Sequence, residues 1–367
     1  MNVVIAGGGT GGHLYPCVAL AHTFMKREVG TEILFIGTAA GMEAKVVPAQ
    51  GFQFRPIFSQ GFIGKSVLGK IRALCFMLVG LFQSLSHLKR FSPDLVIGIG
   101  GYASSPVMLA AFLLRIKRVI LEPNLIPGIM NKISAPFVHL VITAFHETKN
   151  LLRAKNVACL GVPVRAEILG LKSAPAKNKE GRREKTLLVL GGSQGAHTIN
   201  QAVVNALPLL ERASIRIVHQ TGEKDYEAVA KAYQKQSMNG QVFKFIEKIS
   251  EAYADADFVL SRAGAGTLSE LAIAGLPSLL VPFTGAKGHQ EKNAQPFVKA
   301  GAAEMIANHD LKGEMLAERI LFYLSHPEKL SEMAKAANQL GHPNAADEIV
   351  SACFLLVRGD SVEAAGN

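Results

Sequence analysis

The stretch that decides the fold is the run Val3-Val-Ile-Ala-Gly7-Gly-Gly-Thr-Gly-Gly12 near the N-terminus. Its apolar first part predicts a buried strand, and the glycines that follow predict a tight turn into a helix. The same order of apolar run and glycine turn recurs at residues 95–101, 186–192 and 258–266. Apolar runs without alternation, separated by helical patterns, are typical of parallel strands that are covered on both faces. The sequence therefore predicts an α/β protein with doubly wound parallel sheets.

The pattern starts twice, which predicts two domains. A chain of 367 residues is longer than one ordinary core requires, and a polar, basic stretch at 172–185 separates the two halves. The boundary is expected between 163 and 164, with a first domain at 1–163 and a second at 164–340. Ligands bind at the carboxyl ends of the strands in such folds, so a shared cleft between the two sheets is expected.

Composition narrows the function only partly. The net charge of +10 favours anionic partners, which include nucleic acid, phosphorylated ligands and an acidic membrane surface. The four cysteines are scattered and form no CxxC pair, which argues against zinc and against a disulfide framework and fits a reducing compartment. The N-terminus has no basic segment before its first apolar run, so it reads as a folded start and not as a signal peptide.

The first glycine turn fits GxGxxG, the pattern of dinucleotide binding. That fingerprint also needs an acidic residue at the end of the second strand. Here the second strand ends at Ile36-Gly-Thr-Ala-Ala40, and the nearest acid, Glu43, lies beyond it. A dehydrogenase is therefore disfavoured. The turns keep their physical use, because glycine lets the backbone approach a ligand and the next helix presents free N–H groups to a diphosphate or a sugar. One or two glycines in each cluster could serve strand–helix packing alone.

Nine motifs carry a resemblance to a known family. They are, in order, Gly8-Gly-Thr-Gly-Gly-His13 with Pro16, Gly100-Gly-Tyr-Ala-Ser104, Glu122-Pro-Asn124, Gly161-Val-Pro-Val-Arg165, Gly191-Gly-Ser-Gln-Gly195, Arg262-Ala-Gly-Ala-Gly-Thr-Leu-Ser-Glu270, Gly275-Leu-Pro277, Val281-Pro-Phe283 and His289-Gln290 with Asn293. The set, which spans about residues 1–350, resembles the MurG family. Its members are UDP-GlcNAc transferases that convert lipid I to lipid II in bacterial peptidoglycan synthesis.

The resemblance implies a GT-B architecture of two Rossmann-like domains. The acceptor, undecaprenyl-pyrophosphoryl-MurNAc-pentapeptide (lipid I), is expected on the N-terminal domain and UDP-GlcNAc on the C-terminal one. A final helix at 341–358 is expected to return to the N-terminal domain, ahead of a tail at 359–367. The implied reaction is an inverting hexosyl transfer of GlcNAc in cell-wall biogenesis, and hence in cell shape and division. No cofactor is expected, and no metal, because Asp255-Ala-Asp257 falls where a helix enters a strand.

In the N-terminal domain, His13 is the first candidate for the general base that deprotonates the acceptor hydroxyl. It lies at a helix start after a glycine turn, and an unperturbed imidazole titrates near neutral pH. A purely capping or substrate-binding histidine stays open, and Glu122 is the rival base. The chain reads Leu121-Glu-Pro-Asn124 where the family has His-Glu-Gln-Asn. Further contacts with acceptor or donor are expected from Thr10, Gly11, Gly12, Tyr102, Ser104 and Asn124.

In the C-terminal domain, the segment 263–270 should be the helix start that receives the diphosphate. Its backbone N–H groups and Thr267 are expected to meet phosphate or ribose, and Glu270 the ribose hydroxyls, unless that acid only complements the helix dipole. By resemblance, the other contacts are Arg165, Ser193, Ala265, Gly266 and Gln290, together with the backbone of Phe245 and Ile246 at the uracil. Sequence alone would place Phe245 and Ile246 in the core.

The segment 73–82 is a ten-residue apolar run, too short to span a bilayer. A leucine stripe (Leu74, Leu78, Leu81, Leu85 and Leu88) is expected to face the core. A second stripe of Phe76, Val79 and Phe82, flanked by basic residues, suits a helix that lies on anionic lipid. A fully buried helix is the alternative. With the resemblance, a peripheral position on the cytoplasmic face of the inner membrane is expected, and no nucleic acid partner.

Three other functions compete with this interpretation. A related GT-B transferase could act on another lipid acceptor, such as diacylglycerol. A UDP-GlcNAc epimerase could use the same scaffold, and a catalytically silent protein could bind the nucleotide-sugar. Transfer of GlcNAc to a lipid I analogue would distinguish the leading interpretation from the first two alternatives. A His13→Ala variant that binds UDP but no longer transfers GlcNAc would argue against the third.

Overall fold

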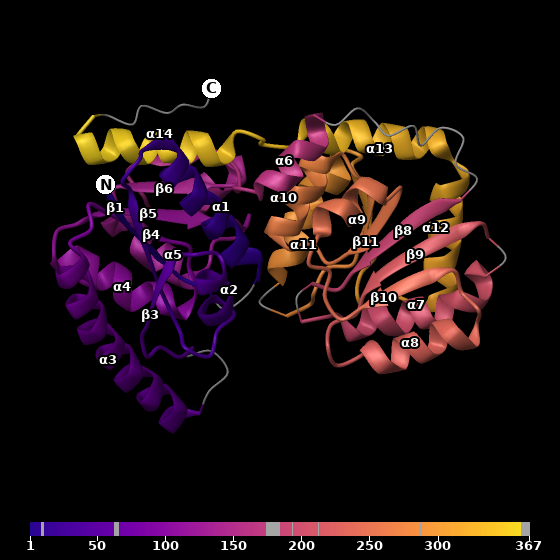
Figure 1. Ribbon diagram of the computed structural model, residues 1–367, viewed down its shortest axis with the longest axis horizontal. Helices are drawn as coiled ribbons and strands as arrows, with labels where there is room; N and C mark the ends of the chain where they lie inside the picture. Colours follow the sequence, from indigo (N-terminus) through magenta and orange to yellow (C-terminus); the bar gives the residue numbers. More distant parts are fainter. Residues whose placement is uncertain are drawn as a thin grey trace. The chain divides into compact units, whose positions relative to one another are not determined.

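The computed structural model describes residues 1–8, 11–61, 66–173, 184–192, 194–211, 213–285 and 288–360. The chain divides into two compact units (Figure 1). Unit 1 comprises Met1–Arg165 and the C-terminal segment from His342, and unit 2 comprises Ala166–Gly341. Each unit is built on one parallel sheet, so the predicted doubly wound α/β class is confirmed.

In the described part of unit 1, seven parallel strands lie in the order β3-β2-β1-β4-β5-β6-β7. Their bounds are β1 Asn2–Ala6, β2 Glu32–Gly37, β3 Gln53–Pro56, β4 Leu95–Gly98, β5 Lys117–Glu122, β6 Leu140–Thr143 and β7 Val157–Cys159. Strand β1 pairs with β2 on one side and with β4 on the other. The order therefore reverses between β1 and β4, and such a switch point is where ligands bind in open α/β sheets.

Helices cover both faces of the unit 1 sheet. Their bounds are α1 Gly11–Arg27, α2 Glu43–Ala49, α3 Val67–Phe91, α4 Gly101–Leu113, α5 Ile129–Ser134 and α14 Ala345–Arg358, with the short 3-10 helices η1 Ala135–Phe137 and η2 His146–Leu151. Helices α1, α2 and α14 share one core with the sheet, and α3 and α4 share the core on the opposite face. The C-terminal α14 lies along α1 (Figure 1), where Phe354 meets Phe24 edge-on at 5.8 Å.

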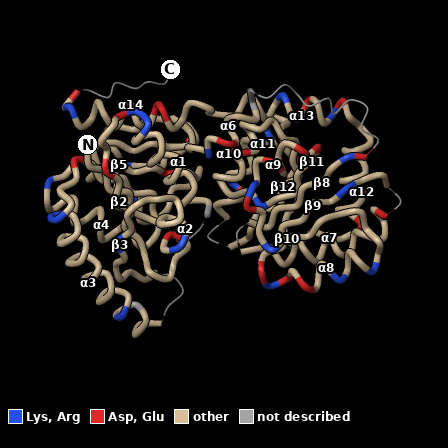
Figure 2. Tube along the Cα trace, in the orientation of Figure 1, with Lys and Arg blue, Asp and Glu red and all other residues tan. Residues whose placement is uncertain are grey.

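Helix α3 extends beyond the apolar run 73–82 at both ends, and part of its predicted inward stripe is exposed. It spans 25 residues and is long and apolar enough to cross a membrane by length and composition, although the apolar run 73–82 predicted otherwise. Only 18% of its most apolar window is buried within the structure. Figure 2 shows basic residues near its two ends and no acidic residue along it. Helix α3 packs against α4, as a helix of unit 1.

Small residues are part of the side of α3 that faces the protein. Ala73, Gly80 and Ser84 are buried, whereas Leu74 and Leu78 are exposed, so the predicted inward stripe is wrong for these two leucines. A β-carbon on Gly80 would lie 2.2 Å from the carbonyl oxygen of Phe58. The helix therefore approaches a neighbouring backbone so closely that no large side chain fits at that position. The rest of the predicted stripe does face the core, because Leu88 is buried and Leu81 and Leu85 pack against the same core.

Unit 2 repeats the arrangement. In the part that the structure describes, six parallel strands lie in the order β10-β9-β8-β11-β12-β13, with the switch point between β8 and β11. The strands are β8 Lys185–Leu190, β9 Ile215–Gln220, β10 Gly240–Phe243, β11 Phe258–Ser261, β12 Ser278–Leu280 and β13 Ala303–Met305. The helices are α6 Ala166–Ser173, α7 His197–Leu210, α8 Tyr226–Lys235, α9 Ile249–Asp255, α10 Ala265–Ala274, α11 His289–Lys299, α12 Gly313–Ser325 and α13 Pro327–Gln339.

Candidate active site

The four glycine turns of the sequence lie at equivalent places in the two units. In unit 1 they follow β1 and β4, and in unit 2 they follow β8 and β11. These are the two strands that flank the switch point in each sheet. Each turn leads into a helix, so each switch point is bordered by two helix N-termini with their positive dipole ends. The fold thus gives each unit one place suited to an anionic or hydroxyl-rich ligand.

The two glycine turns of unit 1 touch each other. A β-carbon on Gly7 would lie 2.5 Å from the Ile99 side chain and 3.1 Å from the carbonyl oxygen of Gly100. One on Gly101 would lie 3.4 Å from the carbonyl oxygen of Gly8. Gly7 is therefore required for packing between the two turns, a structural role other than the strand–helix packing that the sequence left open. Gly12 differs, because it is exposed and has open space around it.

Glu43 is a residue of this site that the sequence interpretation missed. It is buried at the start of α2, and its Oε1 accepts both the backbone N–H and the hydroxyl of Thr38 at 2.9 Å. A β-carbon on Gly8 or Gly41 would fall within 3 Å of its carboxylate. Glu43 therefore fills the space behind the first glycine turn. Because Glu43 is buried there, it cannot act as the ribose-binding acid of a dinucleotide site. The glycines that surround it were the only sign in the sequence that a side chain would fill this space.

His13 is half-buried in the first turn of α1. Two residues further on, the Arg165 guanidinium lies over the ring of Tyr15, with its Cζ 4.8 Å from the ring centroid. This cation–π contact holds Arg165 close to the start of α1. Tyr102 is partly exposed in the first turn of α4, and its carbonyl accepts the Ser59 hydroxyl at 2.7 Å. Gly11 begins α1, and Thr10 lies outside the described residues.

Glu122 ends β5, is 1% exposed, and accepts four hydrogen bonds from the loop that follows it. Its Oε1 accepts the backbone and side-chain N–H groups of Asn124 at 2.9 and 3.2 Å. Its Oε2 accepts the Gly128 N–H and the Asn131 side chain, both at 2.8 Å. Burial raises the pKa of this carboxyl, and the four donors oppose that rise. The geometry is that of an anchor for the loop 124–131, which makes Glu122 a poor candidate for the base.

The loop held by Glu122 reaches the second glycine turn through Asn131. A β-carbon on Gly100 would lie 3.1 Å from the Asn131 amide. Ser104 is 3% exposed and points at the sheet, where its Oγ would lie 2.6 Å from a β-carbon on Gly98. The prediction that Ser104 contacts a sugar is therefore not supported. The small Ser104 side chain instead lets α4 pack close to β4.

In unit 2, Gln220 joins two of the predicted binding segments. It ends β9 and is nearly buried; its Nε2 donates to the Gly192 carbonyl at 3.0 Å and its Oε1 accepts the Ile246 N–H at 2.8 Å. The turn after β8 and the segment after β10 are thus fixed to each other. Phe245 is 41% exposed and Ile246 half-buried, so the expectation from sequence alone that both are core residues is wrong. Ser193 lies outside the described residues.

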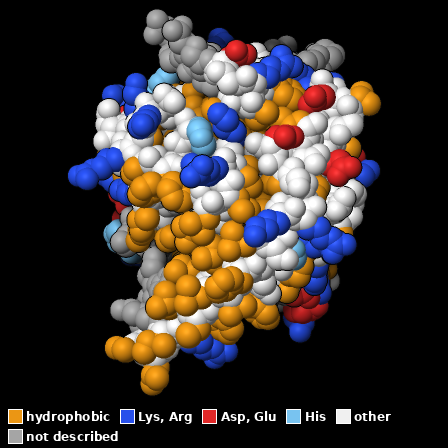
Figure 3. Space-filling model, turned by 90° about the vertical axis from the view of Figure 1, so that its left-hand side faces the viewer, with side chains coloured by type: hydrophobic (Ala, Val, Ile, Leu, Met, Phe, Trp, Pro, Cys, Tyr) orange, Lys and Arg blue, Asp and Glu red, His pale blue; other side chains and the backbone are white. Residues whose placement is uncertain are grey.

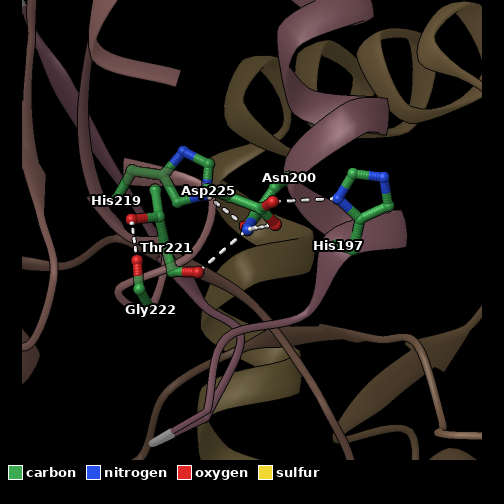
Figure 4. A network of polar contacts seen from close by, with 6 residues as sticks. All are labelled: His197, Asn200, His219, Thr221, Gly222 and Asp225. Carbon is green, nitrogen blue, oxygen red and sulfur yellow. Dashed lines mark hydrogen bonds and ion pairs between the residues drawn. The ribbon is translucent and has the colours of Figure 1, made fainter. Parts of the chain in front are cut away.

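A polar network lies behind the turn after β8 (Figure 4). Asn200, on α7, donates to the Thr221 carbonyl at 2.9 Å and to Asp225 at 2.7 Å, and Asp225 also meets His197 at 3.0 Å. The Asn200 oxygen lies 3.0 Å from Nε2 of buried His219. That nitrogen must therefore carry the proton, so Nδ1 accepts from the hydroxyl of Tyr233 at 3.1 Å. His219 is held in its neutral form, and burial lowers its pKa to about 3.

We expect this histidine to make stability depend on pH. The unfolded chain protonates His219 near pH 6.5 and the folded chain only near pH 3, so its contribution to stability is complete above about pH 6.5 and falls as the pH decreases. Between pH 7 and pH 5 the free energy of unfolding should drop by about 2 kcal/mol through this residue. Urea unfolding followed by circular dichroism at both pH values measures the drop. His219→Gln is the control, because its drop should be smaller by that amount; an equal drop in both proteins contradicts the assignment.

The turn after β11 presents the start of α10. Gly264 is the N-cap and offers no side-chain acceptor, and the first turn holds no acidic residue. Thr267 is half-buried in that turn, with its Oγ1 3.9 Å from a β-carbon on Gly264. Ala265 and Gly266 are buried, so only their backbone can meet a ligand. A helix start of this kind suits a diphosphate.

Glu270 lies in the second turn of α10, not in the first. It is half-buried, and its Oε2 accepts the hydroxyl of Tyr253 at 2.9 Å. The alternative in which it is a first-turn acid that complements the helix dipole is therefore wrong. A carboxylate oriented by a tyrosine hydroxyl is suited to accepting hydrogen bonds from ribose hydroxyls.

Two further side chains shape this part of unit 2. Arg262 was part of the quoted motif, but no role was predicted for it. Its Nη1 donates to the Val281 carbonyl at 2.9 Å and to Asn308 at 2.6 Å, and its Nη2 to Thr198 at 2.7 Å, so it ties the ends of three elements together. Gln290, at the start of α11, accepts the Phe283 N–H at 2.9 Å through its Oε1. Its amide nitrogen is then the group that can meet a sugar hydroxyl.

Asp257 directly precedes β11, so it lies at the amino-terminal ends of the parallel strands, whereas these turns follow their carboxyl ends. Its Oδ2 accepts the Thr186 N–H at 2.8 Å, and Lys185 lies 3.8 Å from its other oxygen. Asp255 ends α9, before the strand. The pair therefore sits where β8 and β11 begin, away from the carboxyl ends of the strands. It is not placed to hold a metal ion at a diphosphate bound there.

Comparison with protein families finds one match in each half of the chain. The description "Glycosyltransferase family 28 N-terminal domain" matches residues 3–143, and "Glycosyltransferase family 28 C-terminal domain" matches residues 186–349. Among curated relatives, a UDP-N-acetylglucosamine–N-acetylmuramyl-(pentapeptide) pyrophosphoryl-undecaprenol N-acetylglucosamine transferase of Anaeromyxobacter sp. (strain Fw109-5) is 44% identical, covering 98% of this chain and 94% of the relative. A protein of the same description from Syntrophus aciditrophicus is 43% identical, covering 98% and 99%.

Solved structures show the same architecture. The crystal structure of Acinetobacter baumannii MurG matches with a TM-score of 0.75 at 28% identity, over 98% of this chain and 99% of that one. A UDP-GlcNAc 2-epimerase from Neisseria meningitidis, bound to UDP-GlcNAc, matches with a TM-score of 0.67 at 16% identity, over 96% and 100%. At that identity the likeness to the epimerase shows the fold alone.

Proposed function

This chain belongs to glycosyltransferase family 28 and, within it, to the MurG family, and from that membership we infer that it transfers N-acetylglucosamine from UDP-GlcNAc to lipid I, which yields lipid II. It is thus a hexosyltransferase of peptidoglycan synthesis. One observation places this activity in the structure: two glycine turns border the switch point of each sheet, and the family's motif residues lie on these turns.

Unit 2 has the features of a nucleotide-sugar site. The diphosphate would meet the uncapped start of α10 and Thr267, where the helix dipole stabilises the charge that develops on the leaving UDP. The ribose would meet Glu270, which Tyr253 orients. The uracil would meet the backbone at Phe245 and Ile246, a segment that Gln220 fixes to the turn after β8. Gln290 would hold a hydroxyl of the sugar.

Unit 1 supplies the acceptor side of the reaction. The acceptor hydroxyl attacks the anomeric carbon while a base removes its proton and UDP departs, which inverts the configuration. His13 is the proposed base, since it lies in the first turn of α1, directly after the glycine turn that meets the turn after β4, whereas Glu122 is occupied by its loop. Tyr102, at the start of α4, lies on the neighbouring turn and would bind a sugar of the acceptor.

Transfer of radiolabelled GlcNAc tests the proposal. With UDP-GlcNAc and a lipid I analogue, the full chain should form a labelled lipid product and release UDP in equal amounts. The control reactions contain UDP-GlcNAc alone and a diacylglycerol acceptor. Release of free ManNAc or UDP-ManNAc without acceptor would identify an epimerase. Transfer to diacylglycerol alone would identify a transferase for another lipid.

We also propose that unit 1 binds the cytoplasmic face of the inner membrane through α3, because its acceptor is a membrane lipid. Large apolar side chains along α3 are exposed: Val67, Leu68, Ile71, Leu74, Leu78, Val79 and Phe82. Figure 3 shows an apolar surface on this side of the molecule with basic residues along its border. This is the pattern of a helix that lies in the interface of an anionic bilayer, and its cations serve lipid rather than nucleic acid. Contact through one exposed face supports a peripheral position rather than a span.

Phe82 is 70% exposed and Val79 is also exposed, whereas Phe76 is half-buried and stacks on Phe58 at 5.8 Å. Replacing Phe76, Val79 and Phe82 by Ser should weaken liposome binding at least about tenfold, because part of each side chain's burial, about 1.5–3 kcal/mol when complete, is lost. Sedimentation with vesicles measures the change. Met25→Ser with Val29→Ser, which removes exposed apolar side chains elsewhere in unit 1, is the control. Unchanged binding of a folded triple variant contradicts the proposed membrane contact.

A further inference from the structure

The turn after β12 presents a large aromatic side chain to solvent. This residue is Phe283, and 50% of its surface is exposed, whereas Val281 and Pro282 before it are buried. These three residues form one of the motifs in the sequence, but no role was predicted for the phenylalanine ring. Because the turn follows the carboxyl end of β12, the ring lies at the ligand-binding edge of the unit 2 sheet.

The Phe283 ring is held on one face and on one edge. The Arg262 guanidinium lies over the ring, with its Cζ 5.8 Å from the ring centroid. Arg262 is itself fixed, because its Nη1 donates to Asn308 at 2.6 Å and its Nη2 to Thr198 at 2.7 Å. A β-carbon on Gly285 would lie 2.2 Å from Cε1 of the ring, so the chain packs closely against one ring edge. The exposed part is therefore a rigid surface, which loses little conformational freedom when a ligand covers it.

The order of the strands places Phe283 beyond the diphosphate seat. In the sheet, β10 and β12 are separated by β9, β8 and β11. Neighbouring strands lie about 4.8 Å apart, so the end of β12 is about 19 Å from the uracil segment after β10. It is one strand, about 5 Å, from the turn after β11, where the start of α10 suits a diphosphate. A donor that runs from uracil through diphosphate to sugar therefore brings its sugar to the turn that carries Phe283.

Gln290 lies beside this ring with its amide nitrogen available to the same sugar. Its Oε1 accepts the Phe283 N–H at 2.9 Å, which fixes the two residues relative to each other. In the chair form of GlcNAc, the hydroxyl and acetamido groups of the ring are equatorial, and the axial C–H bonds leave the two faces apolar. The amide can then donate to an equatorial hydroxyl while the phenylalanine ring covers one face. Ligand sites combine aromatic surface with a few polar groups in this way.

We propose that Phe283 binds the GlcNAc unit of the donor, with its exposed ring packed on an apolar face of the sugar. The inference rests on the proposed function, since it takes UDP-GlcNAc as the donor. The ring carries no charge and no hydrogen-bonding group, so it gains contact energy from the sugar and none from the diphosphate. Phe283 therefore contributes to the affinity for UDP-GlcNAc and not to the affinity for UDP.

Calorimetry with UDP and with UDP-GlcNAc tests this difference on the full chain. Phe283→Ala should lower the affinity for UDP-GlcNAc roughly 5- to 10-fold, because the exposed half of the ring is no longer there to be covered, and the affinity for UDP less than about twofold. Phe283→Tyr, which keeps the ring, should lose less than Phe283→Ala. Phe322→Ala is the matched control, because it removes a phenylalanine of 36% exposure on α12 and should change neither affinity. Equal losses for UDP and UDP-GlcNAc in Phe283→Ala overturn the proposal, since the ring would then only support the fold, and so does an unchanged affinity for both.

Transfer kinetics separate the donor from the acceptor, and this inference from the proposed function. With a lipid I analogue, Phe283→Ala should raise the KM for UDP-GlcNAc roughly 5- to 10-fold and leave the KM for the acceptor unchanged. A raised KM for the acceptor alone would place the ring against the acceptor and overturn the proposal. If the unchanged protein binds UDP-GlcNAc more tightly than Phe283→Ala does but transfers no GlcNAc, the proposed function fails and the contact with the sugar stands. If it transfers GlcNAc and Phe283→Ala binds UDP-GlcNAc equally well, only the contact fails.

Discussion

His13→Ala should lower the turnover number for GlcNAc transfer by roughly 10²- to 10⁴-fold, the usual contribution of a positioned general base. The residue lies in the first turn of α1, where the backbone after β1 meets the turn after β4. An alanine there keeps the helix and removes only the imidazole. The turnover number and the KM for a lipid I analogue are measured separately, because loss of a base lowers turnover whereas loss of a binding contact raises KM.

Binding of UDP provides the control for this variant. His13 is not among the residues proposed to bind the donor in unit 2, so His13→Ala should bind UDP as the unchanged protein does, as measured by calorimetry. Retained UDP binding with abolished transfer would also argue against a catalytically silent binding protein. Turnover within a few-fold of the unchanged enzyme would remove His13 as the base and return it to a capping or binding role.

Glu122→Gln should have a different effect. The glutamine N–H₂ group would face N–H donors, such as those of Gly128 and Asn131, that now donate to the carboxylate. Each buried donor that loses its acceptor costs about 1–3 kcal/mol. We therefore expect a loss of stability and a smaller loss of turnover than for His13→Ala. Thermal unfolding and the transfer assay, run on both variants, compare the two residues. A larger loss of turnover in a fully stable Glu122→Gln would make Glu122 the base.

The fold could be predicted from the sequence because its signals are local. A strand, a glycine turn and a helix follow each other within a dozen residues, as in Val3–Gly12, and the pattern repeats often enough to define the class. The orientation of α3 could not be predicted in the same way. Leucine spacing suggested an inward stripe, which holds for Leu81, Leu85 and Leu88 and fails for Leu74 and Leu78. In the middle of the helix, the close approach of Gly80 to the Phe58 backbone leaves no room for a large side chain. That contact joins residues from different elements, which periodicity does not report.

The candidate site was predicted where a residue's neighbours in sequence determine its place. His13, Gly100–Tyr102 and Gly264–Thr267 all lie on turns beside the switch points. Residues that act through distant partners were missed. Glu43 fills the space behind Gly8, and Gln220 joins Gly192 to Ile246, which lies 26 residues beyond it. For an acid or an amide near the end of a strand, the sequence does not show which distant residue the side chain will contact in the folded chain.

The second large effect is expected at Gly195, in the turn after β8. Its backbone has φ 75°, and a β-carbon there would lie 2.1 Å from the carbonyl oxygen of Thr221. Gly195→Ala cannot be accommodated by a rotamer change, because the obstacle is backbone, so the turn must move away from the segment that Gln220 and Thr221 hold in place. We expect kcat/KM for UDP-GlcNAc to fall more than about 100-fold, since misplacement of a binding group by about 1 Å has that effect.

Gly192→Ala separates the clash from backbone strain. Gly192 has a similar φ of 83°, but a β-carbon there would meet nothing within 4 Å. Both variants pay the cost of a left-handed residue, about 1–2 kcal/mol, and only Gly195→Ala adds the collision. Thermal unfolding should therefore show a smaller loss for Gly192→Ala, and UDP affinity should fall further in Gly195→Ala. Equal effects of the two variants would mean that strain alone decides, and that the contact between this turn and Thr221 does not position the donor.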